Sequence, residues 1–219
     1  MNAFPVIPAY NEQKHITEVI EKTKKQIDSR KIIVVDDGSR DATAEEAQKS
    51  GVTVIRHIVN LGKGAALKTG CDYAVMQGAD AIIVLDSDTQ HDPEEIPHFT
   101  RALENADMVF GYRSLGGKMP LVFRFGNWFI GTATRILFHM KINDTQCGYR
   151  AFKKEAYQKI RWKATDYSVE SEMIALAGKH RIKFEQVPVK TIYVDKYKGT
   201  TVMDGISIVA QMIWWKFTR

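Results

Sequence analysis

The sequence predicts an α/β fold: one domain built on a mostly parallel central sheet with helices on both faces. Three observations carry this prediction. Apolar runs alternate with amphipathic ones in a βαβα order through the first half of the chain. The apolar runs are continuous, which is typical of strands covered on both faces. The 219 residues contain no repeat, low-complexity tract or obvious linker, and they suffice for one large core.

The expected elements follow in order. Strands are expected over residues 3–7, 31–36, 52–58, 81–86 and 106–112, and helices over residues 12–27, 39–51, 62–78 and 93–105. The first helix places Ile16, Val19, Ile20 and Ile27 on one stripe. The next two helices close on glycines, and the fourth begins with Asp92 as N-cap before a proline.

Two apolar segments follow the predicted sheet. Residues 119–141 mix aromatic and aliphatic side chains with arginine and lysine, which suits an interfacial helix beside anionic lipid and equally a helix that closes the domain's own core. The predicted main domain spans residues 1–203, and residues 204–219 predict an amphipathic, interfacial C-terminal helix. Trp214 and Trp215 are adjacent and cannot share one helical face, which favours a membrane or a partner protein for this helix.

Charge and cysteine usage limit the partners. The net charge of +5 and a pI near 9.1 favour an anionic partner such as a nucleotide or a phospholipid surface. The two cysteines lack metal-type spacing, which indicates a reduced, cytoplasmic compartment. The first residues carry no basic and apolar pattern of a secretory signal. The uncharged residues 205–215 are too few to span a bilayer, which needs about 20 apolar residues.

Polar residues follow the predicted strands at the edge of the sheet where ligands bind. Asp36 and Asp37 follow the second strand, and the fourth is followed by Asp86, Ser87 and Asp88. A bare Asp-X-Asp is more often a solvated turn. Here a strand precedes it, a capped helix follows it, and a second acidic turn accompanies it. The pattern therefore favours a divalent cation that bridges a diphosphate.

The segment Gly62–Lys63–Gly64 opens the third helix. It imitates a dinucleotide fingerprint only in part, and it lacks the pattern of a Walker A loop. Two interpretations stay open: Lys63 contacts a nucleotide at the helix N-terminus, or the glycines serve close packing.

Six ordered blocks, IPAYNE, VVDDGSRD, NLGKGAAL, LDSDTQHDPEEIP, GYR and NDTQCGYRAF, resemble family 2 glycosyltransferases of GT-A fold. Among these, the chain is most similar to dolichyl-phosphate and polyprenyl-phosphate hexosyltransferases, from residue 7 to about residue 188. The resemblance implies a nucleotide-sugar set of Pro8, Ala9, Tyr10, Glu12, Val35, Asp37, Lys63, Asp86, Ser87, Asp88 and Arg113. It implies that Mg²⁺ or Mn²⁺ binds to Asp86, Asp88 and Gln90. It also implies catalytic roles for Asp88, Arg113 and Asp144, the last at the sugar end of the cleft.

The implied reaction moves a hexose from a GDP- or UDP-sugar to a polyprenyl or dolichyl phosphate with inversion. The acceptor phosphate would meet Arg124, Lys196 and Lys198, although the Ser-Lys pair of many relatives is absent from this last region. Because a phosphate is already anionic, no strong base is required. Asp144 would orient or stabilise the sugar or metal, or be a simple turn residue.

We expect the protein to sit on the cytoplasmic face of a membrane, with a membrane-anchoring partner protein possible and no nucleic acid partner. Three other functions stay open: a glycosyltransferase with a soluble or glycan acceptor, a nucleotidyltransferase, and a non-catalytic nucleotide-sugar binding module.

Overall fold

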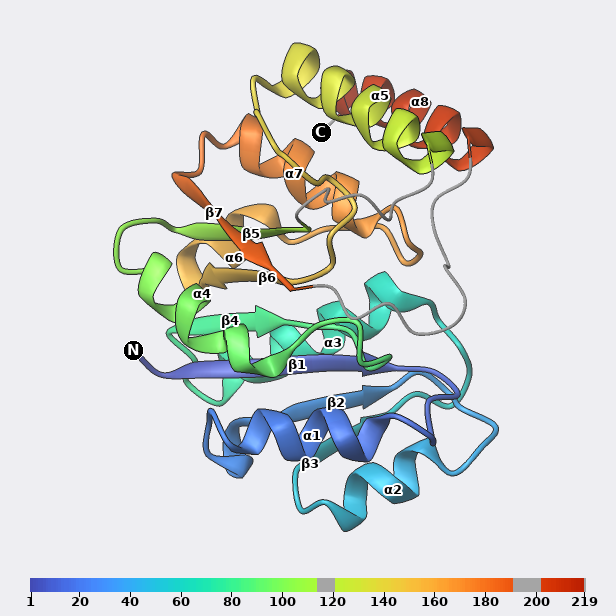
Figure 1. Ribbon diagram of the computed structural model, residues 1–219, viewed down its shortest axis with the longest axis vertical. Helices are drawn as coiled ribbons and strands as arrows, with labels where there is room; N and C mark the ends of the chain where they lie inside the picture. The colour runs from blue at the N-terminus through green and yellow to red at the C-terminus, as the bar shows by residue number, and fades with distance from the viewer. Residues whose placement is uncertain (114–120, 191–201, 219) are drawn as a thin grey trace.

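A seven-stranded sheet forms the centre of the computed structural model, which describes residues 1–113, 121–190 and 202–218, and side chains within these ranges except at 121–127 and 202–206 (Figure 1). The strand order is β3-β2-β1-β4-β6-β5-β7. The strands are β1 (Ala3–Ala9), β2 (Ile33–Asp36), β3 (Thr53–Arg56), β4 (Ala81–Val84), β5 (Met108–Arg113), β6 (Arg150–Lys153) and β7 (Phe184–Val189).

Helices cover both faces of the sheet. They are α1 (Ile16–Lys24), α2 (Thr43–Lys49), α3 (Lys63–Met76), α4 (Ile96–Ala102), α5 (Leu121–Phe138), α6 (Lys154–Ile160), α7 (Val169–Lys179) and α8 (Val202–Thr218). Short 3₁₀ turns span Ser29–Lys31 and Pro93–Glu95. The apolar residues of α1, α2 and α4 form one core layer, and those of α3, α5, α6, α7 and α8 form the other. The predicted α/β fold is confirmed.

Successive residues of one strand pack into the two core layers on opposite faces of the sheet. In β1, Val6 packs into the layer of α3, and Ile7 packs into the layer of α1. This two-sided burial is the reason the strands read as unbroken apolar runs. The nine expected elements all form, and most are shorter at one or both ends than the sequence pattern predicts.

Strand β6 runs antiparallel to both of its neighbours, β4 and β5. Val84 at the end of β4 pairs with Arg150, the first residue of β6, and Phe110 of β5 pairs with the same residue. The reversal therefore brings the residues just before β6 to the carboxyl ends of the parallel strands. None of the four elements β6, β7, α6 and α7 was predicted from the sequence.

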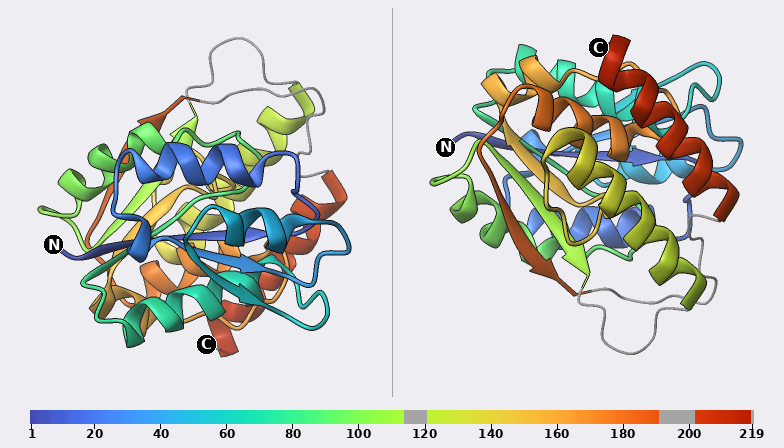
Figure 2. Two further views of the ribbon diagram at one scale, coloured as in Figure 1. Left: turned by 90° about the horizontal axis from the view of Figure 1, so that it is seen from below. Right: turned by 90° about the horizontal axis from the view of Figure 1, so that it is seen from above.

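Helices α5 and α8 lie side by side over α7 (Figures 1 and 2). They run in the same direction, because Thr134 contacts Met212 and the Lys216 ammonium donates to the Leu137 carbonyl 2.6 Å away. Trp215 is 6% exposed within the core, whereas Trp214 is 67% exposed. The two tryptophans thus lie on different faces, as their adjacency requires. No helix in the described part of the chain is long and apolar enough to cross a membrane.

Candidate active site

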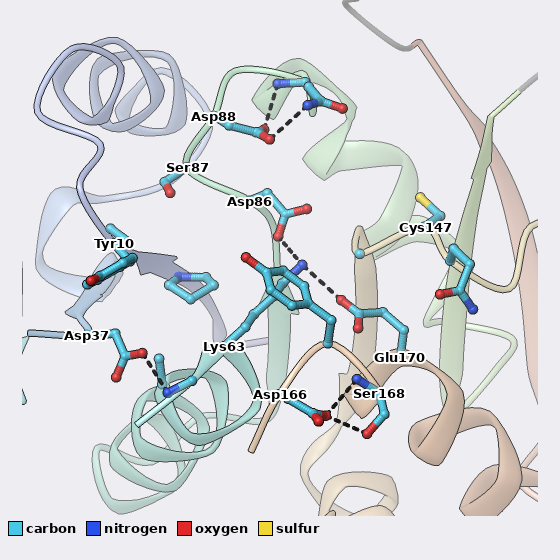
Figure 3. Close-up of a pocket in the computed structure, with 18 of the residues that line it drawn as sticks. Tyr10, Asp37, Lys63, Asp86, Ser87, Asp88, Cys147, Asp166, Ser168 and Glu170 are labelled. Atoms are coloured by element: carbon cyan, nitrogen blue, oxygen red, sulfur yellow. Dashed lines mark hydrogen bonds and ion pairs between the residues drawn. The ribbon is translucent and has the colours of Figure 1, made fainter. Parts of the chain in front are cut away.

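A cleft of about 810 Å³ opens at the carboxyl ends of the strands. Its walls come from the loops after β1, β2 and β4, the N-terminus of α3, the segment before β6 and the loop before α7 (Figure 3). Helix α8 contributes a further wall. Parallel α/β sheets bind their ligands at this edge.

The loop after β4 carries the Asp-Ser-Asp motif into the cleft. The Asp88 carboxylate accepts hydrogen bonds from the backbone and side-chain nitrogens of Gln90, at 3.1 and 2.9 Å. Between them, Thr89 holds a positive φ of 64°, which a β-branched residue rarely adopts. Such strain is typical of functional loops. His91 fixes the start of the loop, because its Nδ1 accepts from the Asp86 backbone N–H at 3.1 Å. Burial lowers the pKa of His91, in keeping with a neutral ring.

Lys63 lies at the centre of the cleft and bridges two carboxylates. Its ammonium is 2.6 Å from Asp86 Oδ1 and 2.8 Å from Glu170 Oε1 (Figure 3). Burial would lower the pKa of Lys63, but the two carboxylates outweigh it and raise this pKa above its ordinary value. Burial would raise the pKa of Asp86, yet the Lys63 charge leads the effects that lower it overall. Both groups are therefore ionised at neutral pH.

Three glycines allow this arrangement. A Cβ on Gly62 would lie 2.3 Å from the Thr165 carbonyl oxygen, and one on Gly64 would lie 2.3 Å from that of Ala164. A Cβ on Gly148 would lie 2.8 Å from Asp86 Oδ2. Gly62 and Gly64 thus serve close packing against the loop before α7. Lys63 reaches the cleft, and its contact with a nucleotide stays a prediction.

Asp37 lines the cleft, but its carboxylate holds the loop between β3 and α3. Oδ1 accepts from the Leu61 N–H at 3.0 Å and lies 2.7 Å from His57 Nδ1, while Oδ2 accepts from the Gly62 N–H at 2.8 Å. The side chain is almost completely buried. Its first role in this structure is therefore to position the residues that lead into Lys63.

Asp144 does not line the cleft. It is buried behind Arg113, with Oδ2 2.6 Å from Nε and Oδ1 3.0 Å from Nη2, and Arg113 itself reaches the cleft. This geometry orients Arg113. The expected role of Asp144 toward the sugar stays a prediction.

Arg150 anchors the segment before β6 from inside the core. Its guanidinium donates to the carbonyls of Thr145, Cys147 and Glu170 at 2.9, 3.0 and 2.6 Å. It thereby joins that segment to the first turn of α7. Cys147 lines the cleft, and burial raises its pKa to about 12, which leaves a thiol without nucleophilic character.

The structure brings most of the expected site together. Of the nucleotide-sugar set, Val35 alone does not line the cleft, because its side chain faces α3 within the core. Gln90 lies beside Asp88 as expected. The Arg124 side chain, Lys196 and Lys198 lie outside the described residues. Other lining residues were not predicted from the sequence: Gln146, Asp166, Tyr167 and Glu170, and Ser207 and Gln211 of α8. Of these residues, only Gln146 lies in a block that the sequence singled out, NDTQCGYRAF.

The fold is similar to that of solved glycosyltransferases of the GT-A type. The crystal structure of glucosyl-3-phosphoglycerate synthase from Mycobacterium tuberculosis, in complex with Mn²⁺, UDP-glucose and phosphoglyceric acid, matches with a TM-score of 0.77 at 22% identity. The match covers 96% of this chain and 79% of that one. Residues 6–161 match the family model of glycosyl transferase family 2, so the chain belongs to this family.

Two relatives match over nearly their whole length. An uncharacterized protein of Methanocaldococcus jannaschii is 41% identical over 97% of this chain and 91% of the relative. The UDP-N-acetylglucosamine–dolichyl-phosphate N-acetylglucosaminyltransferase of Methanococcus voltae is 33% identical over 98% of this chain and 96% of the relative. The chain is thus similar to an enzyme named for transfer to a lipid phosphate.

The donor set of the cleft fits a divalent cation. Among the described lining residues, the carboxylates of Glu12, Asp37, Asp86, Asp88, Asp166 and Glu170 face only two strong cations, Lys63 and Arg113. A nucleoside diphosphate would add further negative charge. Mg²⁺ and Mn²⁺ prefer one or two carboxylates together with phosphate oxygens. The described residues contain no group of three or more His, Cys, Asp or Glu side chains placed to hold a metal ion.

Proposed function

We propose that this protein transfers a hexose from a UDP- or GDP-sugar to a polyprenyl or dolichyl phosphate, with inversion at the anomeric carbon. The observation that carries the proposal is the Lys63–Asp86–Glu170 bridge beside Asp88 in a cleft of a family 2 glycosyltransferase. Tyr10 and the loop that Asp37 holds provide a wall for the nucleoside. A divalent cation bound to Asp86 and Asp88, with Gln90 beside them, would offset the charge of the departing nucleoside diphosphate.

The ion pairs of the cleft favour an anionic acceptor. Asp86 and Glu170 both engage Lys63, and Asp144 engages Arg113, so none of these three carboxylates is a free base for a hydroxyl group. A phosphate needs no base. Its oxygen attacks the anomeric carbon, and the bond from this carbon to the diphosphate oxygen breaks with its electron pair on the leaving group. Arg113, oriented by Asp144, would hold the acceptor phosphate in line for this attack.

The surface beside the cleft supports a lipid-borne acceptor. Ser207, Ile208 and Gln211 of α8 line the cleft, and α8 also exposes Ile213, Trp214 and Phe217. The neighbouring α5 exposes Trp128, Phe129 and Ile136 beside Arg135. Apolar and basic side chains on one pair of helices suit the boundary of an anionic bilayer. We therefore place the protein at the cytoplasmic face of a membrane, by itself or with an anchoring partner protein.

A transfer assay tests the proposal. The purified chain is incubated with a polyprenyl phosphate in detergent, with UDP-glucose, UDP-N-acetylglucosamine or GDP-mannose, and with Mn²⁺ or Mg²⁺. We expect release of nucleoside diphosphate and a glycosylated lipid product for at least one donor, and neither in the presence of EDTA. Turnover on phosphoglyceric acid or a glycan, with none on the lipid phosphate, would replace the proposed acceptor. Release of pyrophosphate from a nucleoside triphosphate would indicate a nucleotidyltransferase.

A further inference from the structure

The loop of residues 163–168, between α6 and α7, forms one wall of the cleft. Hydrogen bonds tie its backbone to the neighbouring helices. Glu172 accepts hydrogen bonds from the N–H groups of Lys163 and Ala164, at 3.0 and 2.7 Å. On the other side, the Thr165 carbonyl accepts from the N–H of Gly64 at 2.7 Å. The loop is thus tied both to α7 and to the N-terminus of α3, which positions the residues that follow, Asp166 and Tyr167, at the cleft.

Two side chains of this loop reach the cleft while their polar or aromatic groups remain available. Tyr167 lines the cleft and is 76% exposed, with the Lys63 ammonium 5.9 Å from its ring centroid. Asp166 also lines the cleft. Its Oδ1 accepts from the backbone and hydroxyl of Ser168, at 2.9 and 2.6 Å, whereas no described residue hydrogen-bonds Oδ2. Two consecutive residues of the loop therefore offer an exposed aromatic ring and a carboxylate oxygen to the cleft.

The position of the loop relates it to one part of the donor. In Figure 3, Tyr10 and Asp37 lie to one side, Asp86 and Lys63 lie in the middle, and Asp166, Ser168 and Glu170 lie beyond Lys63. A nucleoside against Tyr10 and a diphosphate near Asp86 would leave the third part of the donor, its sugar, on the side of the loop.

Sugars match this pair of groups chemically. A pyranose ring has an apolar face of C–H groups that packs on an aromatic ring, and its hydroxyl groups donate to a carboxylate. We propose that Asp166 and Tyr167 form the hexose subsite and select the transferred sugar. This inference rests on the proposed function, since it requires a nucleotide-sugar donor.

Isothermal titration calorimetry with two ligands separates the subsite from the rest of the cleft. The first ligand is whichever of UDP-glucose, UDP-N-acetylglucosamine and GDP-mannose the wild-type protein binds most tightly in the presence of Mn²⁺. The second ligand is the nucleoside diphosphate of that sugar nucleotide. Tyr167→Ala should weaken binding of the sugar nucleotide about tenfold and leave the Kd of the nucleoside diphosphate unchanged. Tyr167→Phe keeps the ring and should bind both ligands like wild type.

Asp166→Asn should also weaken binding of the sugar nucleotide alone, because an amide accepts hydroxyl hydrogen bonds less strongly than a carboxylate. It should also change the order of affinities among the three sugar nucleotides. Met76→Ala, which shortens an exposed apolar side chain outside the cleft lining, is the control and should change neither Kd.

The possible outcomes separate the two proposals. If Tyr167→Ala raises the Kd of both ligands by the same factor, the ring contacts the nucleotide and the hexose subsite is rejected. If Tyr167→Ala and Asp166→Asn bind the sugar nucleotide like wild type, the subsite is rejected while the glycosyltransferase proposal stands. If the wild-type protein binds none of the sugar nucleotides, both proposals fail together.

Discussion

Asp144 and Arg113 form a two-point ion pair in which the carboxylate is buried and the guanidinium reaches the cleft. The two residues are 31 positions apart and meet because Arg113 ends β5 while Asp144 precedes β6, its antiparallel neighbour. We expect Asp144→Asn to lower kcat/KM about 100-fold, because misplacement of a positioning cation by about 1 Å costs that much.

The same pair contributes to stability. Loss of the buried Asp144 charge should lower the free energy of unfolding by about 3 kcal/mol in urea titrations. Arg113→Lys should retain more stability but not the activity, since an ammonium cannot form both bonds. Wild-type kcat/KM for Asp144→Asn would show that Arg113 needs no such orientation.

The second prediction concerns Asp88. Asp88→Asn should abolish transfer and weaken Mn²⁺ binding in the presence of the nucleoside diphosphate, because it removes one of two charges expected at the cation. The fold should remain intact, since asparagine can still accept the Gln90 N–H. Asp92→Asn is the matched control, because Asp92 caps the following 3₁₀ turn and asparagine caps as well. Asp88→Asn with full activity in metal-replete buffer would contradict a metal role.

Asp37 gives the third prediction. Because its carboxylate accepts two backbone N–H groups and faces His57, Asp37→Ala should lower the free energy of unfolding by about 3 kcal/mol or more. Donor binding should weaken as a consequence of the displaced loop before Lys63. Chemical denaturation and titration with the nucleoside diphosphate measure the two effects. An unchanged stability combined with lost binding would instead indicate direct recognition of the base.

Gly148 provides the fourth prediction. In Gly148→Ala the new methyl group would meet Asp86 Oδ2 at 2.8 Å and Lys63 Nζ at 3.1 Å, so the bridge must shift. We expect a loss of transfer of at least about tenfold, from displacement of the reacting groups. Gly131→Ala in α5 meets no atom closer than 3.8 Å and should be neutral or stabilising by up to about 1 kcal/mol. Equal activity of the two variants would argue against a role for the bridge.

The adjacent tryptophans of α8 give the fifth prediction. Trp214→Ala should reduce co-sedimentation with anionic liposomes while leaving the thermal midpoint unchanged, because Trp214 is exposed. Trp215→Ala should lower the free energy of unfolding by about 3–5 kcal/mol, because Trp215 lies in the core. If wild-type protein does not sediment with liposomes at low salt, the exposed face serves a protein partner instead.

The parallel part of the fold could be predicted from sequence because each strand and helix from β1 to β5 is local and its apolar pattern is continuous. The position of Asp86 and Asp88 followed from the rule that parallel sheets bind ligands at one edge. Strand β6 was missed because four residues carry no periodicity of their own. Glu170 was missed for a related reason: it joins Lys63 only because the loop before α7, far along the chain, packs against the start of α3.

The orientation of side chains was harder still to anticipate. A carboxylate after a strand reads the same in the sequence whether it faces a ligand or a neighbouring loop. Asp37 and Asp144 were both expected at the donor, and their contacts with the donor stay predictions. In this structure their carboxylates bond to partners within the chain, Leu61, Gly62 and Arg113. Those partners become apparent only when the loops that surround the cleft are placed together in space.

The insertion of β6 between β4 and β5 has a consequence for how the chain folds. Strands β1, β2 and β3 pair through consecutive βαβ crossovers and can assemble early from local contacts. Pairing of β1 with β4 must close residues 10–80, and pairing of β4 with β6 must close residues 85–149, each with the corresponding loss of chain entropy. The nucleoside side of the cleft therefore forms from the early half, while Gly148 and Glu170 arrive with the late half. Catalytic competence should appear only in the last kinetic phase of refolding, after most of the helical signal has recovered.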